Sequence, residues 1–153
     1  MKTRILIPAL VLTAMLFAQG AWAHCEVPCG IYDDAARIAL MREHITTVEK
    51  SMHMVEELSG AESMNYNQIV RWVNNKETHA DEIQHIVSQY FMTQRVKPVA
   101  SDDSGYGTFV EKVTVLHQLL IEAMKSKQTL DHDHIDAMRN LVDRFEKLYF
   151  VKK

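Results

Sequence analysis

The sequence predicts an all-α protein that folds as an antiparallel four-helix bundle. Hydrophobic residues recur at helical spacing through most of the chain, and no stretch alternates convincingly with the period of a strand. Of the 153 residues, 47% are hydrophobic, and only five are glycine and three proline. This composition excludes a disordered or collagen-like chain, and the length is typical of one domain. The net charge of −3 argues against a nucleic-acid-binding protein.

The first expected helix covers residues 34–58. Its apolar residues follow one another at steps of three or four, which places them on one face: Ile38, Met41, Ile45, Val48, Met52 and Val55. Asp33 is a suitable N-cap, Asp34 suits the positive end of the helix dipole, and Gly60 ends the helix.

Three further helices are expected at residues 65–94, 108–127 and 133–150. Each carries an apolar seam: Ile69, Val73, Ala80, Ile83, Val87 and Tyr90 in the second helix, Phe109, Val113, Leu116, Leu120 and Met124 in the third, and Ile135, Met138, Val142, Phe145 and Tyr149 in the fourth. Pro98 and the polar run at 101–105 separate the second helix from the third. Four amphipathic helices joined by short polar loops are typical of a bundle around one core, here residues 33–153.

Residues 1–23 have the features of a secretory signal peptide. Lys2 and Arg4 precede an apolar run at 5–17. An Ala-Trp-Ala sequence at 21–23 matches a signal peptidase site. The run is shorter than the stretch of about 20 apolar residues that a transmembrane helix needs. We therefore expect an exported protein, periplasmic or extracellular, without stable membrane insertion after processing.

Cleavage after residue 23 would place both cysteines of the chain near a new N-terminus, in the segment His-Cys-Glu-Val-Pro-Cys-Gly-Ile-Tyr at 24–32. The freed amine of His24 and the amide nitrogen of Cys25 can close one five-membered chelate ring around a metal. The Cys25 thiolate closes a second ring, and Cys29 can return a thiolate to the fourth position. A planar set of two nitrogens and two thiolates favours nickel or copper(II). Nickel fits better, because copper(II) tends to oxidise thiolates.

The motif His-Cys-x-x-Pro-Cys-Gly-x-Tyr at a processed N-terminus resembles the nickel hook of nickel-containing superoxide dismutases. The resemblance implies a metal-binding hook at 24–32, with one nickel ion per subunit bound by His24, Cys25 and Cys29. It also implies an oxidoreductase that converts superoxide to dioxygen and hydrogen peroxide by Ni(III)/Ni(II) cycling, and assembly as a homohexamer. Tyr32 is expected at the substrate approach, with Tyr90 as a second tyrosine near the site.

The chain also departs from that family. Its best-known members pair a glutamate of the first helix with an arginine of the second helix, behind the histidine whose imidazole binds the metal. The corresponding positions here lie near Ala39 and Asn75, and neither residue is charged. We expect other residues to surround the site, with the stretch 75–77 as one candidate.

Other interpretations remain open. The two cysteines could form a disulfide, although so small a loop is sterically awkward. A different function class is an exported nickel- or copper-binding or delivery protein without catalysis, to which Met52-His53-Met54 would contribute soft ligands. Helical spacing places Met52 on the core seam, which favours packing instead. The acid–histidine run at 131–134 is expected to be a polar loop with an N-cap, and at best an adventitious metal site.

Overall fold

The computed structural model describes residue 26 and residues 28–151. The chain divides into two units after Gly30, and the second unit, Ile31–Lys153, carries the helices. These are α2 (Asp34–Ser59), α3 (Tyr66–His85), the π-helix η1 (Ile86–Arg95), α4 (Tyr106–Gln128) and α5 (Asp133–Tyr149). No strand occurs among the described residues. The prediction of an all-α four-helix bundle is confirmed.

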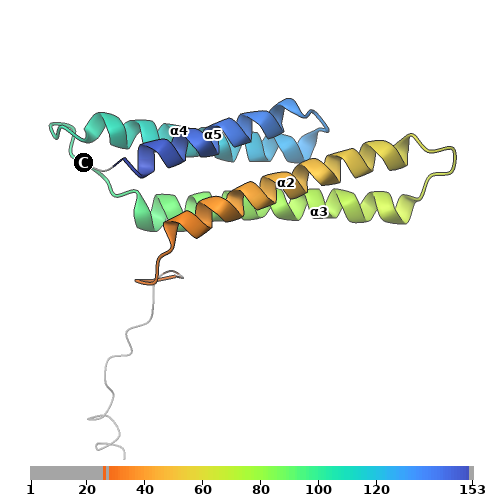
Figure 1. The fold of residues 1–153 in the computed structure, drawn as a ribbon, viewed down its shortest axis with the longest axis horizontal. Coiled ribbons are helices and arrows are strands. Elements are labelled where there is room, and N and C mark those ends of the chain that lie inside the picture. The colour runs from red at the N-terminus through yellow and green to blue at the C-terminus, as the bar shows by residue number, and fades with distance from the viewer. Residues whose placement is uncertain (1–25, 27, 152–153) are drawn as a thin grey trace, which may run out of the picture. The chain divides into compact units, whose positions relative to one another are not determined.

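The helices pack as two antiparallel pairs. Figure 1 shows α2 beside α3 and α4 beside α5, and the four close into a ring because α3 also contacts α4 and α2 also contacts α5. Short connections between successive helices produce this up-and-down order. No helix of the described ranges is both long enough and apolar enough to span a membrane.

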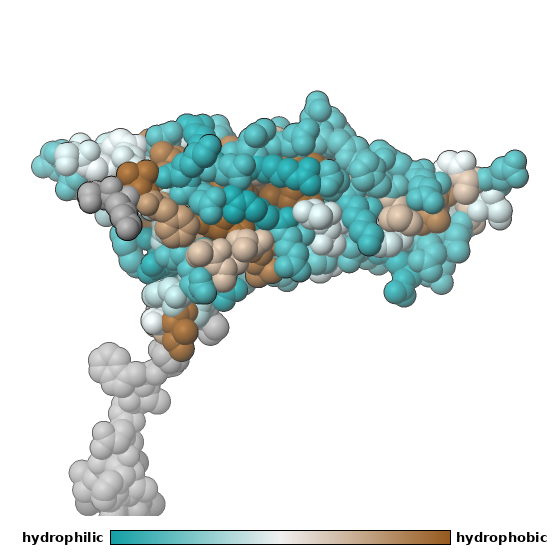
Figure 2. All heavy atoms as spheres, viewed as in Figure 1, coloured by the Kyte–Doolittle hydropathy of each residue, from teal (hydrophilic) through white to brown (hydrophobic). Residues whose placement is uncertain are grey.

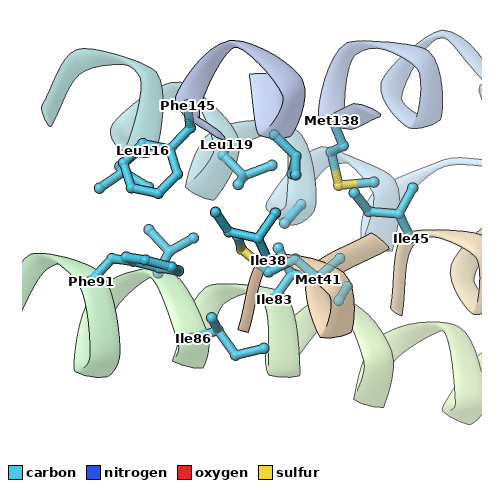
Figure 3. Close-up of a cluster of buried hydrophobic side chains, with 14 of the residues drawn as sticks. Ile38, Met41, Ile45, Ile83, Ile86, Phe91, Leu116, Leu119, Met138 and Phe145 are labelled. Atoms are coloured by element: carbon cyan, nitrogen blue, oxygen red, sulfur yellow. The ribbon is translucent and has the colours of Figure 1, made fainter. Parts of the chain in front are cut away.

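The core lies between the four helices and draws on all of them. Figure 3 shows side chains from each element pointing toward one another: Ile38, Met41, Ile45, Ile83, Ile86, Phe91, Leu116, Leu119, Met138 and Phe145. The seams expected for the first and fourth helices are buried as predicted, with Tyr149 half-buried at the end of the fourth. Met52 is fully buried, which confirms packing rather than metal binding for this methionine.

The seams of the second and third helices differ in part from the prediction. Ile69 and Val73 are only half-buried. The buried residues of α3 lie further along the helix, at Lys76, Ala80 and Ile83. In α4 the buried face runs through Val115, Leu116, Leu119 and Ala123, whereas Met124 is 39% exposed. Two adjacent faces of this helix are apolar, so spacing alone did not decide which of them the bundle would bury.

The ends of α2 follow local chemistry. The Asp33 side chain accepts a hydrogen bond from the amide nitrogen of Ala36 at 2.9 Å, as expected of an N-cap. Gly60 is the C-cap residue, and its N–H donates to the carbonyl of Glu56 at 3.1 Å. Both helix boundaries predicted from these residues are confirmed.

Two residues of the stretch 75–77, the candidate for the surroundings of the metal, make packing contacts between helices. Asn75 Nδ2 donates to Ser51 Oγ at 2.9 Å and so links α3 to α2. Lys76 is 3% exposed, and its Nζ donates to three backbone carbonyls at the end of α4, those of Ser126, Lys127 and Thr129, at 2.7, 2.6 and 3.0 Å. These carbonyls have no partner within their own helix, so Lys76 acts as a C-cap supplied by another helix.

The end of the second helix is a π-helix rather than the α-helix expected there. Over Ile86–Arg95 each turn holds one residue more than an α-turn, and the last bond runs from Val96 N to Phe91 O at 2.7 Å. Thr93 and Gln94 donate side-chain hydrogen bonds to the carbonyls of Ser88 and Gln89. The wider turn changes which side chains share a face, so Tyr90, Phe91 and Gln94 are all buried.

Candidate metal centre

The three metal ligands expected from the sequence are only partly within the described residues. His24 and Cys25 lie outside them. The Cys29 thiol is exposed, and it forms no disulfide with any residue that the structure describes. Gly30, which follows it, has a φ of 80°, a left-handed conformation that favours glycine and turns the chain directly after the thiol. A thiol that is accessible and adjoins a turn fits the role of a nickel ligand, since soft thiolate donors suit that metal.

The structure brings Tyr32 and Tyr90 together. Tyr32 precedes α2 and Tyr90 lies in η1, and their ring centroids are 5.9 Å apart in an edge-to-face arrangement. Tyr32 is 38% exposed, whereas Tyr90 is 4% exposed. The first tyrosine can therefore meet a small molecule from solvent, and the second supports it from behind.

Tyr90 belongs to a hydrogen-bond network centred on the carboxylate of Asp34. Tyr90 Oη donates to Asp34 Oδ1 at 2.7 Å, and Tyr149 Oη donates to Oδ2 at 2.9 Å. Arg95 donates from Nε to Oδ1 at 2.7 Å and from Nη2 to Oδ2 at 2.6 Å. We call these four residues the Asp34 network. It joins α2, η1 and α5 at one point, and the Asp34 side chain is only 15% exposed there.

The network shifts the pKa values of its members in opposite directions. Burial alone would raise the pKa of Asp34, but the hydrogen bonds from Arg95, Tyr90 and Tyr149 outweigh it and hold the pKa below its ordinary value. Burial, and next the hydrogen bond to the Asp34 carboxylate, raise the pKa values of Tyr90 and Tyr149 to about 12 each. The carboxylate therefore stays ionised and both hydroxyls stay protonated at neutral pH.

Two guanidinium groups lie against the aromatic rings of this region. Arg95 Cζ is 4.3 Å from the ring centroid of Tyr32, and Arg37 Cζ is 5.2 Å from that of Tyr90. Both distances are within the range of a cation–π contact. Arg95 thus connects Tyr32 to Asp34, so the position of the exposed tyrosine depends on the buried carboxylate.

A pocket of about 330 Å³ adjoins the network where Arg95 and Tyr149 form part of its wall. Lys97 and Lys112 also line it, against a single acid, Asp103. Lys112 Nζ lies 5.4 Å from the ring centroid of Tyr149. Although the whole chain is acidic, the lining of this pocket holds more basic than acidic residues, and such a surface attracts small anions.

Sequence reasoning missed three residues of this arrangement. It assigned Asp34 to the helix dipole and Tyr149 to the core seam, and it did not single out Arg95. Asp34 and Tyr149 lie more than a hundred positions apart, and no local pattern relates them. The signal available in the sequence was weak: Arg95 stands at the end of the expected second helix, five positions after Tyr90 on its apolar seam.

Comparison with known proteins gives one match. A family model of nickel-containing superoxide dismutases matches residues 19–153. No curated protein and no solved structure matches the chain. The family match runs through the segment 24–32 and all of the helices, and it agrees with the exposed thiol of Cys29 and the adjacent glycine turn. The chain therefore belongs to the nickel-containing superoxide dismutases.

Proposed function

We propose that His24, Cys25 and Cys29 bind the nickel of this superoxide dismutase, one ion per subunit, after removal of residues 1–23. The observation that carries the proposal is the family match across the hook segment. The exposed thiol of Cys29 supports it. When bound, nickel supplies the one-electron Ni(III)/Ni(II) couple with which the enzyme converts superoxide to dioxygen and hydrogen peroxide. The hook residues supply two nitrogens and two thiolates from one short segment.

Tyr32 is the residue that we propose to meet superoxide. Its ring is partly exposed, and the adjacent guanidinium of Arg95 favours an anion beside it. The hydroxyl can donate a hydrogen bond to a small anion or to an ordered water molecule.

We infer a positioning role for Tyr90, because its hydroxyl already donates to Asp34 and its ring packs edge-on against Tyr32. A Tyr90→Phe variant should therefore lower activity only as far as Tyr32 becomes less ordered. NMR signals of Tyr32 would separate this effect from a loss of folding.

Export and assembly belong to the same proposal. The charged start, apolar run and Ala-Trp-Ala sequence of residues 1–23 support cleavage that exposes the amine of His24. Exposed apolar side chains on the bundle support a homo-oligomer, as the resemblance to hexameric members implies; Tyr66 and Val70 are 69% and 57% exposed. Figure 2 shows apolar side chains among the hydrophilic ones that dominate the viewed face.

The decisive experiment is nickel loading of the purified mature protein, followed by intact mass, metal content and superoxide loss. We expect one nickel per chain and activity, both lost in Cys25→Ser and Cys29→Ser, because each change removes a thiolate. Addition of a single residue before His24 should have the same effect, because it converts the amine to an amide. His117→Ala, which removes an exposed histidine of α4, is the matched control and should retain both.

Confirmed nickel binding without superoxide loss would support the ligands but contradict catalysis at this site. It would instead favour the other candidate, a nickel- or copper-delivery protein, particularly if the metal passed reversibly to an acceptor chelator. The family match does not favour that alternative.

A further inference from the structure

Two histidines from separate parts of the sequence meet where α2 approaches the start of α5. His53 lies on α2, and His132 is the residue immediately before α5. Their imidazole rings are stacked, with centroids 4.3 Å apart and planes inclined by 26°. Both side chains reach solvent, at 63% and 34% exposure, so an ion from solution has access to them.

Carboxylates complete the group of donors. A carboxylate oxygen of Glu49 and one ring nitrogen of each histidine lie within 4.8 Å of one another. Glu56 Oε2 is 3.3 Å from His132 Nε2 and 3.5 Å from His53 Nδ1. Glu49, His53 and Glu56 follow one another at steps of four and three on α2, so one face of the helix presents all three.

Arg139 of α5 holds one of these carboxylates in place. Its Nη1 and Nη2 donate to the two oxygens of Glu49 at 2.9 and 2.6 Å. An ionised carboxylate has about four acceptor positions, so this contact leaves others for a cation. Partners of this kind orient metal ligands in proteins. Two carboxylates against one guanidinium also leave the cluster with an excess of negative charge.

We propose that Glu49, His53, Glu56 and His132 form a second metal site, which binds a divalent transition-metal ion of the class represented by zinc. Imidazole and carboxylate together suit zinc, nickel and copper(II). Magnesium and calcium prefer ligand sets made entirely of oxygen. The bound ion would clamp the second half of α2 to the start of α5. Glu49 lies 15 positions after Asp34, about 22 Å along the helix, so the clamp shares no residue with the Asp34 network.

The test uses the untagged, nickel-loaded mature protein, because a histidine tag would compete for the same ions. Calorimetry and metal analysis after dialysis against Zn²⁺ should show one zinc per chain beyond the nickel already bound. His53→Ala and His132→Ala should each weaken this binding at least tenfold. His85→Ala, at an exposed histidine of α3 outside the cluster, should bind as the wild type does.

A second measurement tests the clamp itself. Zinc should raise the midpoint of thermal unfolding of the wild type and of His85→Ala, because a ligand that binds only the folded state stabilises it. The midpoint of His132→Ala should not change with zinc, and Mg²⁺ should shift none of the variants. Absence of the zinc equivalent beyond the bound nickel, or its full retention in both His53→Ala and His132→Ala, would overturn the proposal.

Discussion

Asp34 and Lys76 are both charged side chains held within the bundle, and their surroundings are chemically opposite. Asp34 accepts hydrogen bonds from the side chains of Tyr90, Arg95 and Tyr149. Lys76 donates hydrogen bonds to three backbone carbonyls at the end of α4. The carboxylate thus depends on three particular residues, whereas the ammonium depends on a helix ending at that place.

The two environments respond differently when their partner residues are substituted. Any single substitution among the partners of Asp34 alters its charge environment and, through Arg95, the support of Tyr32. The partners of Lys76 are main-chain atoms, which no substitution removes. Chemistry toward a small anion is therefore expected at the Asp34 end, and the Lys76 contact serves stability.

The largest effect is expected from Asp34→Ala. The change leaves the Arg95 guanidinium and two hydroxyls without their acceptor at a mostly buried position, and it should cost about 3 kcal/mol of unfolding free energy. Urea denaturation followed by circular dichroism measures the loss. The neighbouring Asp33→Ala removes only the N-cap of α2 and should cost about 1 kcal/mol. Equal losses of unfolding free energy at the two positions would contradict the role of Asp34 as the shared acceptor of the network.

Lys76→Met should cost somewhat less, about 2 kcal/mol. Methionine fills the volume of the lysine stem but leaves the carbonyls at the end of α4 without a donor. Hydrogen exchange should then show faster opening of the last turn of α4 than of its middle. Lys147→Met on the exposed face of α5 is the matched control and should leave stability within about 0.5 kcal/mol of the wild type.

Asp34→Asn should lower the pKa values of Tyr90 and Tyr149 from about 12 by about one unit, equivalent to about 1.4 kcal/mol, because the negative charge is lost while burial remains. Tyrosinate absorbance during alkaline titration measures the change, and Tyr90→Phe and Tyr149→Phe assign the signals.

The sign of the corresponding stability effect follows from the raised pKa values. The two tyrosines contribute stability that is fully present below pH 10, their ordinary value, and is lost as the pH rises through about 12. Asp34→Asn removes part of this stability, so it should lower the pH at which the protein unfolds in alkali. An unchanged titration curve would show that burial alone sets these pKa values.

Tyr32→Phe should have the smallest effect on stability, within about 0.5 kcal/mol, because the aromatic ring keeps its contacts with Arg95 and Tyr90. Activity of the nickel-loaded variant should nevertheless fall if the hydroxyl meets superoxide. Steady-state superoxide assays beside a denaturation curve separate the two quantities. Full activity in a stable variant would remove Tyr32 from the proposed substrate approach.

Much of the fold was predictable because its causes are local. The apolar seam from Ile38 to Val55, the cap at Asp33 and the stop at Gly60 depend on residues a few positions apart, and all three predictions are confirmed. The prediction of the buried seam of α4 was partly wrong, since Leu119 and Leu120 belong to two neighbouring apolar faces. The choice between them depends on where the other helices lie.

The sequence by itself determined the number and order of the helices and the hook motif, because helical periodicity and chelate spacing are properties of contiguous residues. The tertiary structure alone decided that Asp34 meets Arg95 and Tyr149, and that His53 meets His132. Such pairs join helices distant in the chain, and their geometry depends on the packing of the bundle and on the extra residue per turn in η1. A one-residue change of helical phase in η1 turns a side chain toward or away from the Asp34 network, and no local sequence pattern contains that information.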